Sequence, residues 1–151
     1  MQIVVNEWLL DYMCPNTDPR KTFMAIQFVN AVVKKCDKIV VGRATPFVSK
    51  FYHYMKSFGW DTDFKKRFSK LNQLLFRNSD KTMVVDEADI EKLPKEIEEK
   101  APPDDKYLIG LGYSSQDRII VTTDQRLKEK FQDDVGLKIY LLEEFLESYL
   151  S

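Results

Sequence analysis

The amino-acid sequence predicts an α/β fold: one domain with a central, mostly parallel sheet covered by helices on both faces. The length of 151 residues suits a single domain. Short runs of β-branched residues alternate with longer amphipathic segments along the whole chain. Because these runs are apolar throughout, they are typical of strands buried on both faces, as in parallel sheets.

The first half of the chain is expected to contain three strands and three long helices. Asp18 and Thr45 are predicted N-caps, each followed by a proline at the first helical position. The apolar face of the first long helix is expected to include Phe23 and Ile26. The strands are expected at 3–5, 38–42 and 82–85, a helical turn at 8–13, and helices at 19–36, 46–58 and 62–78.

The second half begins with an acidic stretch, 86–101, which is predicted to be a short helix and a surface loop. Asp104 is the expected N-cap of the helix that follows it. Gly110 and Gly112 fall inside that helix, which favours close packing over a phosphate-binding loop. The remaining elements are expected to be strands at 118–124 and 137–142 and helices at 102–115, 125–131 and 143–150.

Composition excludes several classes of protein. Hydrophobic residues make up 44% and charged residues 31% of the chain, which excludes general disorder, collagen-like sequence and a coiled-coil rod. No apolar run approaches the roughly 20 residues that a membrane span needs. The N-terminus lacks the basic region of a signal peptide and carries Glu7 inside its apolar stretch. These features predict a cytoplasmic protein without membrane contact.

The chain has two cysteines, Cys14 and Cys36, and one histidine, His53. Their spacing is not that of a zinc site, and both thiols are expected to be free in a reducing cytosol. A cysteine–histidine nucleophilic pair is formally possible. Acid–base or metal chemistry is therefore expected to rest mainly on carboxylates.

Several carboxylates and hydroxyls fall where the predicted strands end. In parallel α/β sheets the ligand site lies beyond the carboxyl ends of the strands. Carboxylate oxygens are the ligands that Mg²⁺ and Mn²⁺ prefer, although carboxylates at these places are also common helix caps. The residues expected at this edge are Asn6, Glu7, Gly42, Arg43, Asp104, Asp105, Thr122, Thr123 and Asp124.

Two parts of the chain resemble the PIN-domain family. The stretch 105–131, DKYLIGLGYSSQDRIIVTTDQRLKEKF, is similar to the C-terminal half of PIN domains, in which an acid opens a helix and another acid follows a strand. The start, IVVNEWLL, is similar to the PIN opening. The resemblance implies a three-layer α/β/α fold and a Mg²⁺- or Mn²⁺-dependent endoribonuclease that cleaves single-stranded RNA. It also implies a possible toxin-type role with an antitoxin-like partner, and a possible homodimer.

The resemblance assigns roles to individual acids. Asp105 and Asp124 match the two late acids of the family, and Asn6 stands where the first acid is usual, with Glu7 beside it. The implied catalytic residues are Asp105, Asp124, Asn6 and Glu7, and the implied metal ligands are Asp105, Asp124, Glu7 and Asp104. A further acid, usual in the helix after the second strand, would fall near Ser49 or Lys50, where the chain has none.

The charge of the chain is divided between its halves. Residues 1–79 hold 13 Lys and Arg against 6 Asp and Glu, whereas residues 80–151 hold 10 against 18. Either both are solvated helix surfaces, or the basic side faces an anionic partner such as RNA. Most aromatic residues of the basic half are expected in the core, with Tyr52 and Trp60 as exposed exceptions. The candidate substrate contacts are Arg43, Thr122, Thr123, Ser49 and Lys50.

The sequence leaves two functions open. One is the metal-dependent ribonuclease. The other is a catalytically degenerate PIN-like domain that binds RNA or protein without turnover. The absent mid-chain acid favours this second function, and the retained pair of Asp105 and Asp124 favours the first.

Overall fold

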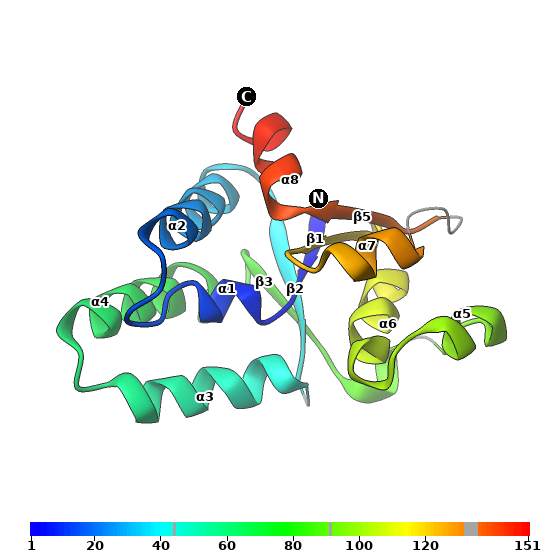
Figure 1. Cartoon of the computed structure of the whole chain (residues 1–151), viewed down its shortest axis with the longest axis horizontal. Coiled ribbons are helices and arrows are strands. Elements are labelled where there is room, and N and C mark those ends of the chain that lie inside the picture. Colours follow the sequence, from blue (N-terminus) through cyan, green and yellow to red (C-terminus); the bar gives the residue numbers. More distant parts are fainter. Residues whose placement is uncertain (44, 91, 132–135) are drawn as a thin grey trace.

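The computed structural model describes residues 1–43, 45–90, 92–131 and 136–151. Its five strands form one sheet in the order β3-β2-β1-β4-β5, and every pairing between neighbouring strands is parallel. The predicted α/β fold with helices on both faces of a parallel sheet is confirmed (Figure 1). The strands are β1 (Gln2–Val5), β2 (Lys38–Gly42), β3 (Thr82–Val85), β4 (Ile119–Thr122) and β5 (Lys138–Leu141).

The helices lie close to their predicted positions. Asp18 caps its helix as predicted, because its side chain accepts a hydrogen bond of 2.9 Å from the backbone N–H of Arg20. The α-helices are α1 (Trp8–Asp11), α2 (Pro19–Lys34), α3 (Pro46–Phe58), α4 (Thr62–Leu71), α5 (Lys95–Lys100), α6 (Lys106–Ser114), α7 (Gln125–Phe131) and α8 (Leu142–Tyr149). The shorter segments are the π-helix η1 (Asn72–Phe76) and the 3₁₀-helices η2 (Glu87–Asp89) and η3 (Pro103–Asp105).

Two local predictions are wrong, and the prediction for Thr45 is confirmed only in its N-cap position. Asp104 does not cap α6, because η3 precedes that helix and Asp105 occupies the N-cap position, without a side-chain capping bond. Thr45 precedes α3 as predicted, but its hydroxyl donates to the carbonyl oxygen of Gly42 at 2.6 Å instead of capping the helix. Phe23 and Ile26, both predicted on the apolar face of α2, are 60% and 36% exposed, because the helix turns other residues toward the sheet.

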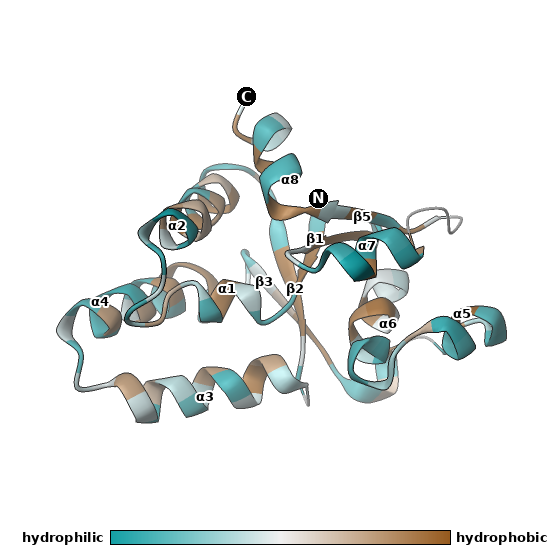
Figure 2. Ribbon diagram, in the orientation of Figure 1, coloured by the Kyte–Doolittle hydropathy of each residue, from teal (hydrophilic) through white to brown (hydrophobic). Residues whose placement is uncertain are grey.

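Helices cover the two faces of the sheet unequally. The helices α1 to α4 and α8 lie on one face, and α5, α6 and α7 lie on the other (Figure 1). Alternate strand residues serve the two cores: Ile3 and Val5 of β1 point to the first face, and Val4 points to the second. The central strands β1, β2 and β4 are accordingly apolar over most of their length (Figure 2). The amphipathic α8 buries Phe145 in the first core, so its apolar face packs on the sheet.

Gly112 lets α6 approach β4 closely. A Cβ atom at this position would lie 2.7 Å from Cδ1 of Ile120 and 2.8 Å from Cδ1 of Leu137. The prediction that the glycines of α6 serve packing is confirmed at Gly112. Among the described residues, no helix is both long and apolar enough to cross a membrane.

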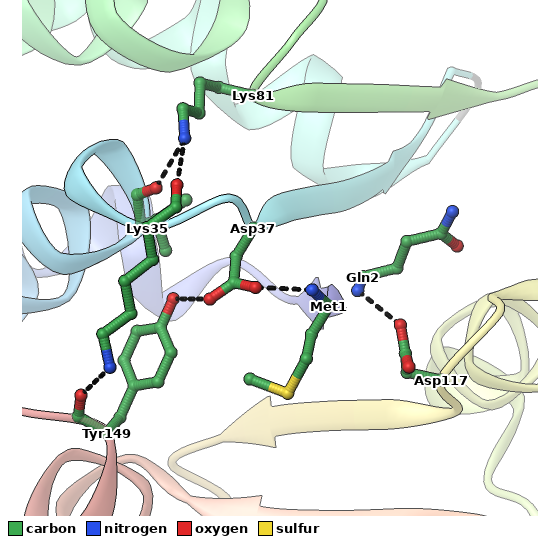
Figure 3. Close-up of polar contacts among 8 residues, drawn as sticks. Met1, Gln2, Lys35, Asp37, Lys81, Asp117 and Tyr149 are labelled. Atoms are coloured by element: carbon green, nitrogen blue, oxygen red, sulfur yellow. Dashed lines mark hydrogen bonds and ion pairs between the residues drawn. The ribbon is translucent and has the colours of Figure 1, made fainter.

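At the amino ends of the strands, Asp37 joins separate parts of the chain (Figure 3). Its carboxylate accepts hydrogen bonds of 2.5 Å from the terminal ammonium of Met1 and from the hydroxyl of Tyr149. The ammonium of Lys35 donates to the Tyr149 carbonyl oxygen and lies over the ring. Burial opposes the charge of Asp37, but the bonds from Met1 and Tyr149 prevail and lower its pKa.

We expect Asp37→Asn to destabilise the fold at pH 7 by about 1–3 kcal/mol, because charged hydrogen bonds to a nearly buried carboxylate are lost. Since the folded state lowers the pKa of Asp37, its contribution is complete above the pKa of the unfolded chain. It is lost as the pH falls through the lower, folded-state pKa. Urea unfolding at pH 7 and pH 3 measures this, with the exposed Asp89→Asn as control. An equal difference between wild type and Asp37→Asn at both pH values would contradict it.

Candidate functional site at the carboxyl edge of the sheet

The strand order places the switch point of the sheet between β1 and β4. The chain passes from β1 to β2 on one side, whereas β4 lies on the other side of β1. Ligands of open α/β sheets bind beyond the strand ends at such a point. Asn6 and Glu7 follow β1, and Thr123 and Asp124 follow β4. The Asn6 amide donates to the Thr122 hydroxyl at 3.4 Å, so the structure brings these two predicted groups together.

Trp8 fixes the chain where it leaves β1. Its indole N–H donates a buried hydrogen bond of 2.8 Å to the carbonyl oxygen of Val121 in β4. The ring is 3% exposed and packs edge-on against Phe28, with centroids 5.3 Å apart. This contact holds the start of α1, and with it Asn6 and Glu7, against the end of β4.

Four acids share the space beyond these strand ends. The pKa of Asp105 is raised, first by burial and then by the negative charges of Asp124, Asp104 and Glu7. These acids come from three separate segments: after β1, before α6 and after β4. We call the set Glu7, Asp104, Asp105 and Asp124 the acidic edge. The structure thus places Glu7, Asp104 and Asp124 where their negative charges act on Asp105.

Glu7 is held by a residue that the sequence reasoning missed. The hydroxyl of Tyr107 in α6 donates to Oε2 of Glu7 at 2.7 Å. Burial raises the pKa of Tyr107, and so do this hydrogen bond and the charges of Glu7 and Asp105. Tyr107 therefore keeps its proton at neutral pH and directs one oxygen of Glu7 toward α6. Its place two residues after Asp105 was visible in the sequence, but its partner was not.

Asp124 serves the start of α7 as well as the acidic edge. Its Oδ1 accepts hydrogen bonds from the backbone N–H groups of Arg126, at 3.0 Å, and Leu127, at 3.2 Å. The Thr122 hydroxyl accepts from the backbone N–H of Asp124 at 3.1 Å and is fully buried. Thr122 therefore supports the turn from within the fold, whereas Thr123 is exposed.

Asn6 has an unusual feature for a residue at a strand end. Its side-chain oxygen Oδ1 is buried and has no hydrogen-bond partner in the described part of the chain. An unpaired buried acceptor costs about 1–3 kcal/mol and calls for an explanation. An amide oxygen is a possible ligand for a hard cation.

The predicted substrate contacts lie in different places. Arg43 follows β2 and pairs through its Nε with Asp86 at 2.5 Å, and both side chains are exposed. Lys50 instead forms an ion pair of 2.9 Å with Asp11 at the end of α1. Ser49 is exposed on α3. The structure therefore links Lys50 to α1.

A cavity of about 520 Å³ adjoins the acidic edge. Tyr107 connects the two, because it lines the cavity and also binds Glu7. The other walls come from Thr45 before α3 and from the segment between β3 and α5, including Leu93. Both signs of charge line it, with Lys106 among the cations.

The described residues contain neither a preformed cluster of metal ligands nor a reactive thiol. Among them, no three His, Cys, Asp or Glu side chains are grouped so that they could hold a metal ion. Cys14 and Cys36 are free, as predicted. Burial and the nearby Asp11 raise the pKa of Cys14 to about 11, so its thiol is protonated at neutral pH.

Comparison with known proteins adds no relative. No protein-family model matches the chain, and no curated protein or solved structure is significantly similar to it. The resemblance to PIN domains therefore stays a prediction from the motifs quoted above.

Proposed function

We propose that the chain is a PIN-like endoribonuclease that uses Mg²⁺ or Mn²⁺ at the acidic edge to cleave single-stranded RNA. The observation that carries this proposal is the convergence of four acids from three segments at the switch point of the sheet. A divalent cation would neutralise the charges that repel the Asp105 carboxylate, and carboxylate oxygens are the ligands that Mg²⁺ and Mn²⁺ prefer. A toxin-type role, an antitoxin-like partner and a homodimer belong to the same proposal.

The donors are all oxygen atoms, which a hard cation prefers, and binding would draw the acids closer together than they lie in the structure. Asp105 and Asp124 would hold it, with Glu7 or Asp104, and Asn6 would offer its unpaired Oδ1. Such a cation lowers the pKa of a bound water and neutralises charge on a phosphodiester. Asp105 is not used as a capping side chain, and the helix-capping bonds of Asp124 use only Oδ1.

Two further residues would position these donors. Protonated Tyr107 orients Glu7 by its hydrogen bond of 2.7 Å. Thr122 accepts from the backbone N–H of Asp124 and from the side-chain amide of Asn6, so it fixes both strand ends. Neither residue needs to touch the substrate for this role.

The test is calorimetric titration with Mn²⁺ to millimolar concentration, followed by a cleavage assay on fluorescent single-stranded RNA. We expect wild type to bind Mn²⁺ and Asp124→Asn to lose binding at least about tenfold, together with cleavage. Asparagine is a good N-cap, so this variant should keep the start of α7. Asp61→Asn makes the same change at the N-cap of α4 and is the matched control.

If wild type does not bind Mn²⁺, the nuclease proposal is refuted. Equal losses in Asp124→Asn and Asp61→Asn would show that helix capping, and not the acidic edge, explains the effect.

A second candidate function is a PIN-like module that binds RNA or protein without turnover. Asn6 brings no charge where the family usually has an acid, and Lys50, near the usual place of another acid, pairs with Asp11. For such a module, Asp124→Asn should leave binding unchanged. RNA binding in EDTA combined with no cleavage in Mn²⁺ would favour it over the nuclease.

A further inference from the structure

A groove of about 420 Å³ runs beside the edge strand β3, between this strand and the helices α3 and η1. We call it the β3 groove. It extends from Arg43, which follows β2 at the carboxyl edge of the sheet, to Thr82 at the start of β3. The residues that matter for its chemistry are Arg43, Phe51, Tyr52, Met55, Arg77 and Val84.

The groove exposes the aromatic ring of Tyr52, which packs against a half-buried aromatic ring. Tyr52 is 66% exposed, and its ring meets Phe51 edge-on at a centroid distance of 5.6 Å. Phe51 in turn stacks on Phe68 of α4 at 5.4 Å. Exposed Met55 and Val84 add apolar surface beside Tyr52. Aromatic and apolar side chains gathered in one exposed groove are typical of a binding surface.

The charged side chains that line the groove favour an anionic ligand. Its lining contains two guanidinium groups, of Arg43 and Arg77, and no carboxylate. Arg43 lies at one end, where it also pairs with Asp86, and exposed Arg77 lies at the C-cap of η1. Apart from Thr82 and Val84, the lining residues belong to the basic half of the chain, which has 13 Lys and Arg against 6 Asp and Glu. Exposed aromatic faces next to cations match single-stranded nucleic acid, whose bases stack while its phosphates pair.

We propose that the β3 groove binds single-stranded RNA, with an unpaired base stacked on Tyr52 and phosphates paired with Arg77 and Arg43. The choice of RNA over DNA rests on the proposed function. Because Arg43 lies at the carboxyl edge of the sheet, a strand in the groove leads toward the side of the molecule that carries the acidic edge. The groove therefore supplies affinity, and the acidic edge supplies the chemistry.

The test is fluorescence anisotropy with a labelled twelve-nucleotide oligouridine in EDTA, so that binding is measured without cleavage. We expect Tyr52→Ala to weaken binding about tenfold or more, through lost stacking. Arg77→Ala should weaken it several-fold and reduce the salt-dependence slope by about one. Phe23→Ala and Arg20→Ala remove an exposed aromatic ring and an exposed cation from α2, and they are the matched controls.

Three results would overturn this inference: no binding by wild type, unchanged affinity in both groove variants, or equal losses in the α2 controls. Binding of an extended peptide to the groove in preference to RNA would also overturn it. The experiment distinguishes failure of this inference from failure of the proposed function. Groove-dependent RNA binding without Mn²⁺-dependent cleavage would refute only the nuclease, and cleavage with affinity unaffected by both groove variants would refute only the groove.

Discussion

Asp105→Asn is expected to abolish Mn²⁺-dependent RNA cleavage and at the same time to make the fold more stable at pH 7. Loss of a metal ligand should lower kcat/KM by at least about 100-fold, since even residues that merely orient ligands can matter that much. The stability gain arises because burial and the charges of Asp124, Asp104 and Glu7 raise the pKa of Asp105. Asparagine keeps the shape and removes the repelled charge.

The gain in stability should depend on pH. A carboxyl group whose pKa is raised by folding stabilises the fold below its unfolded pKa, and this contribution is lost as the pH rises through the folded pKa. Asp105→Asn should therefore exceed wild type at pH 7, by less than about 1 kcal/mol because the site is partly exposed to water. The difference should vanish at acid pH.

Urea unfolding at pH 7 and pH 4, with a cleavage assay at pH 7, measures both effects. Asp63→Asn changes an exposed acid in the first turn of α4 and is the matched control. A variant of Asp105 that is less stable than wild type at pH 7 would contradict the electrostatic argument. Retained cleavage would remove Asp105 from the active site.

Trp8→Ala should destabilise the fold by about 3–5 kcal/mol, the usual cost of removing a large buried aromatic side chain. The indole is 3% exposed, packs edge-on against Phe28 and donates to the Val121 carbonyl oxygen. Trp8→Phe keeps most of the packing and leaves that carbonyl oxygen without this donor, so about 1–3 kcal/mol should be lost. Urea unfolding followed by circular dichroism gives both values.

The chain supplies its own control for this experiment. Trp60 is the second of its two tryptophans and is 74% exposed, so Trp60→Ala should change stability by less than about 0.5 kcal/mol. If the variants of Trp8 and Trp60 lose similar stability, the buried link between α1 and β4 does not have the role described here. Since Trp8 holds the chain beside Glu7, Trp8→Phe should also weaken Mn²⁺ binding.

The strands and most helices could be predicted because their signals are local. A short β-branched run marks β1 to β4, a short apolar run marks β5, and Asp18 followed by Pro19 marks the start of α2. The residues of the acidic edge could be predicted for one further reason, which is that parallel strands end at the same edge of a sheet. Glu7, Asp105 and Asp124 follow from that rule and from the PIN resemblance.

The contacts that shape the site could not be predicted. The bonds from Tyr107 to Glu7 and from Trp8 to Val121 join residues at least a hundred positions apart, and they depend on strand order. Strand order is not determined by the alternation of strands and helices. Helical periodicity likewise identifies an apolar face but does not show where the neighbouring helix packs against it. Phe23 was therefore expected in the core, but its side chain is exposed.

The central position of β1 has a consequence for how the protein is made. Ile3 pairs with Ile119, so β1 cannot gain its second neighbour until more than a hundred further residues have been synthesised and have left the ribosome. Until then, one edge of an apolar strand stays open, which exposes the nascent chain to intermolecular pairing. The switch point closes in the same late event, so the acidic edge is assembled only when folding is nearly complete.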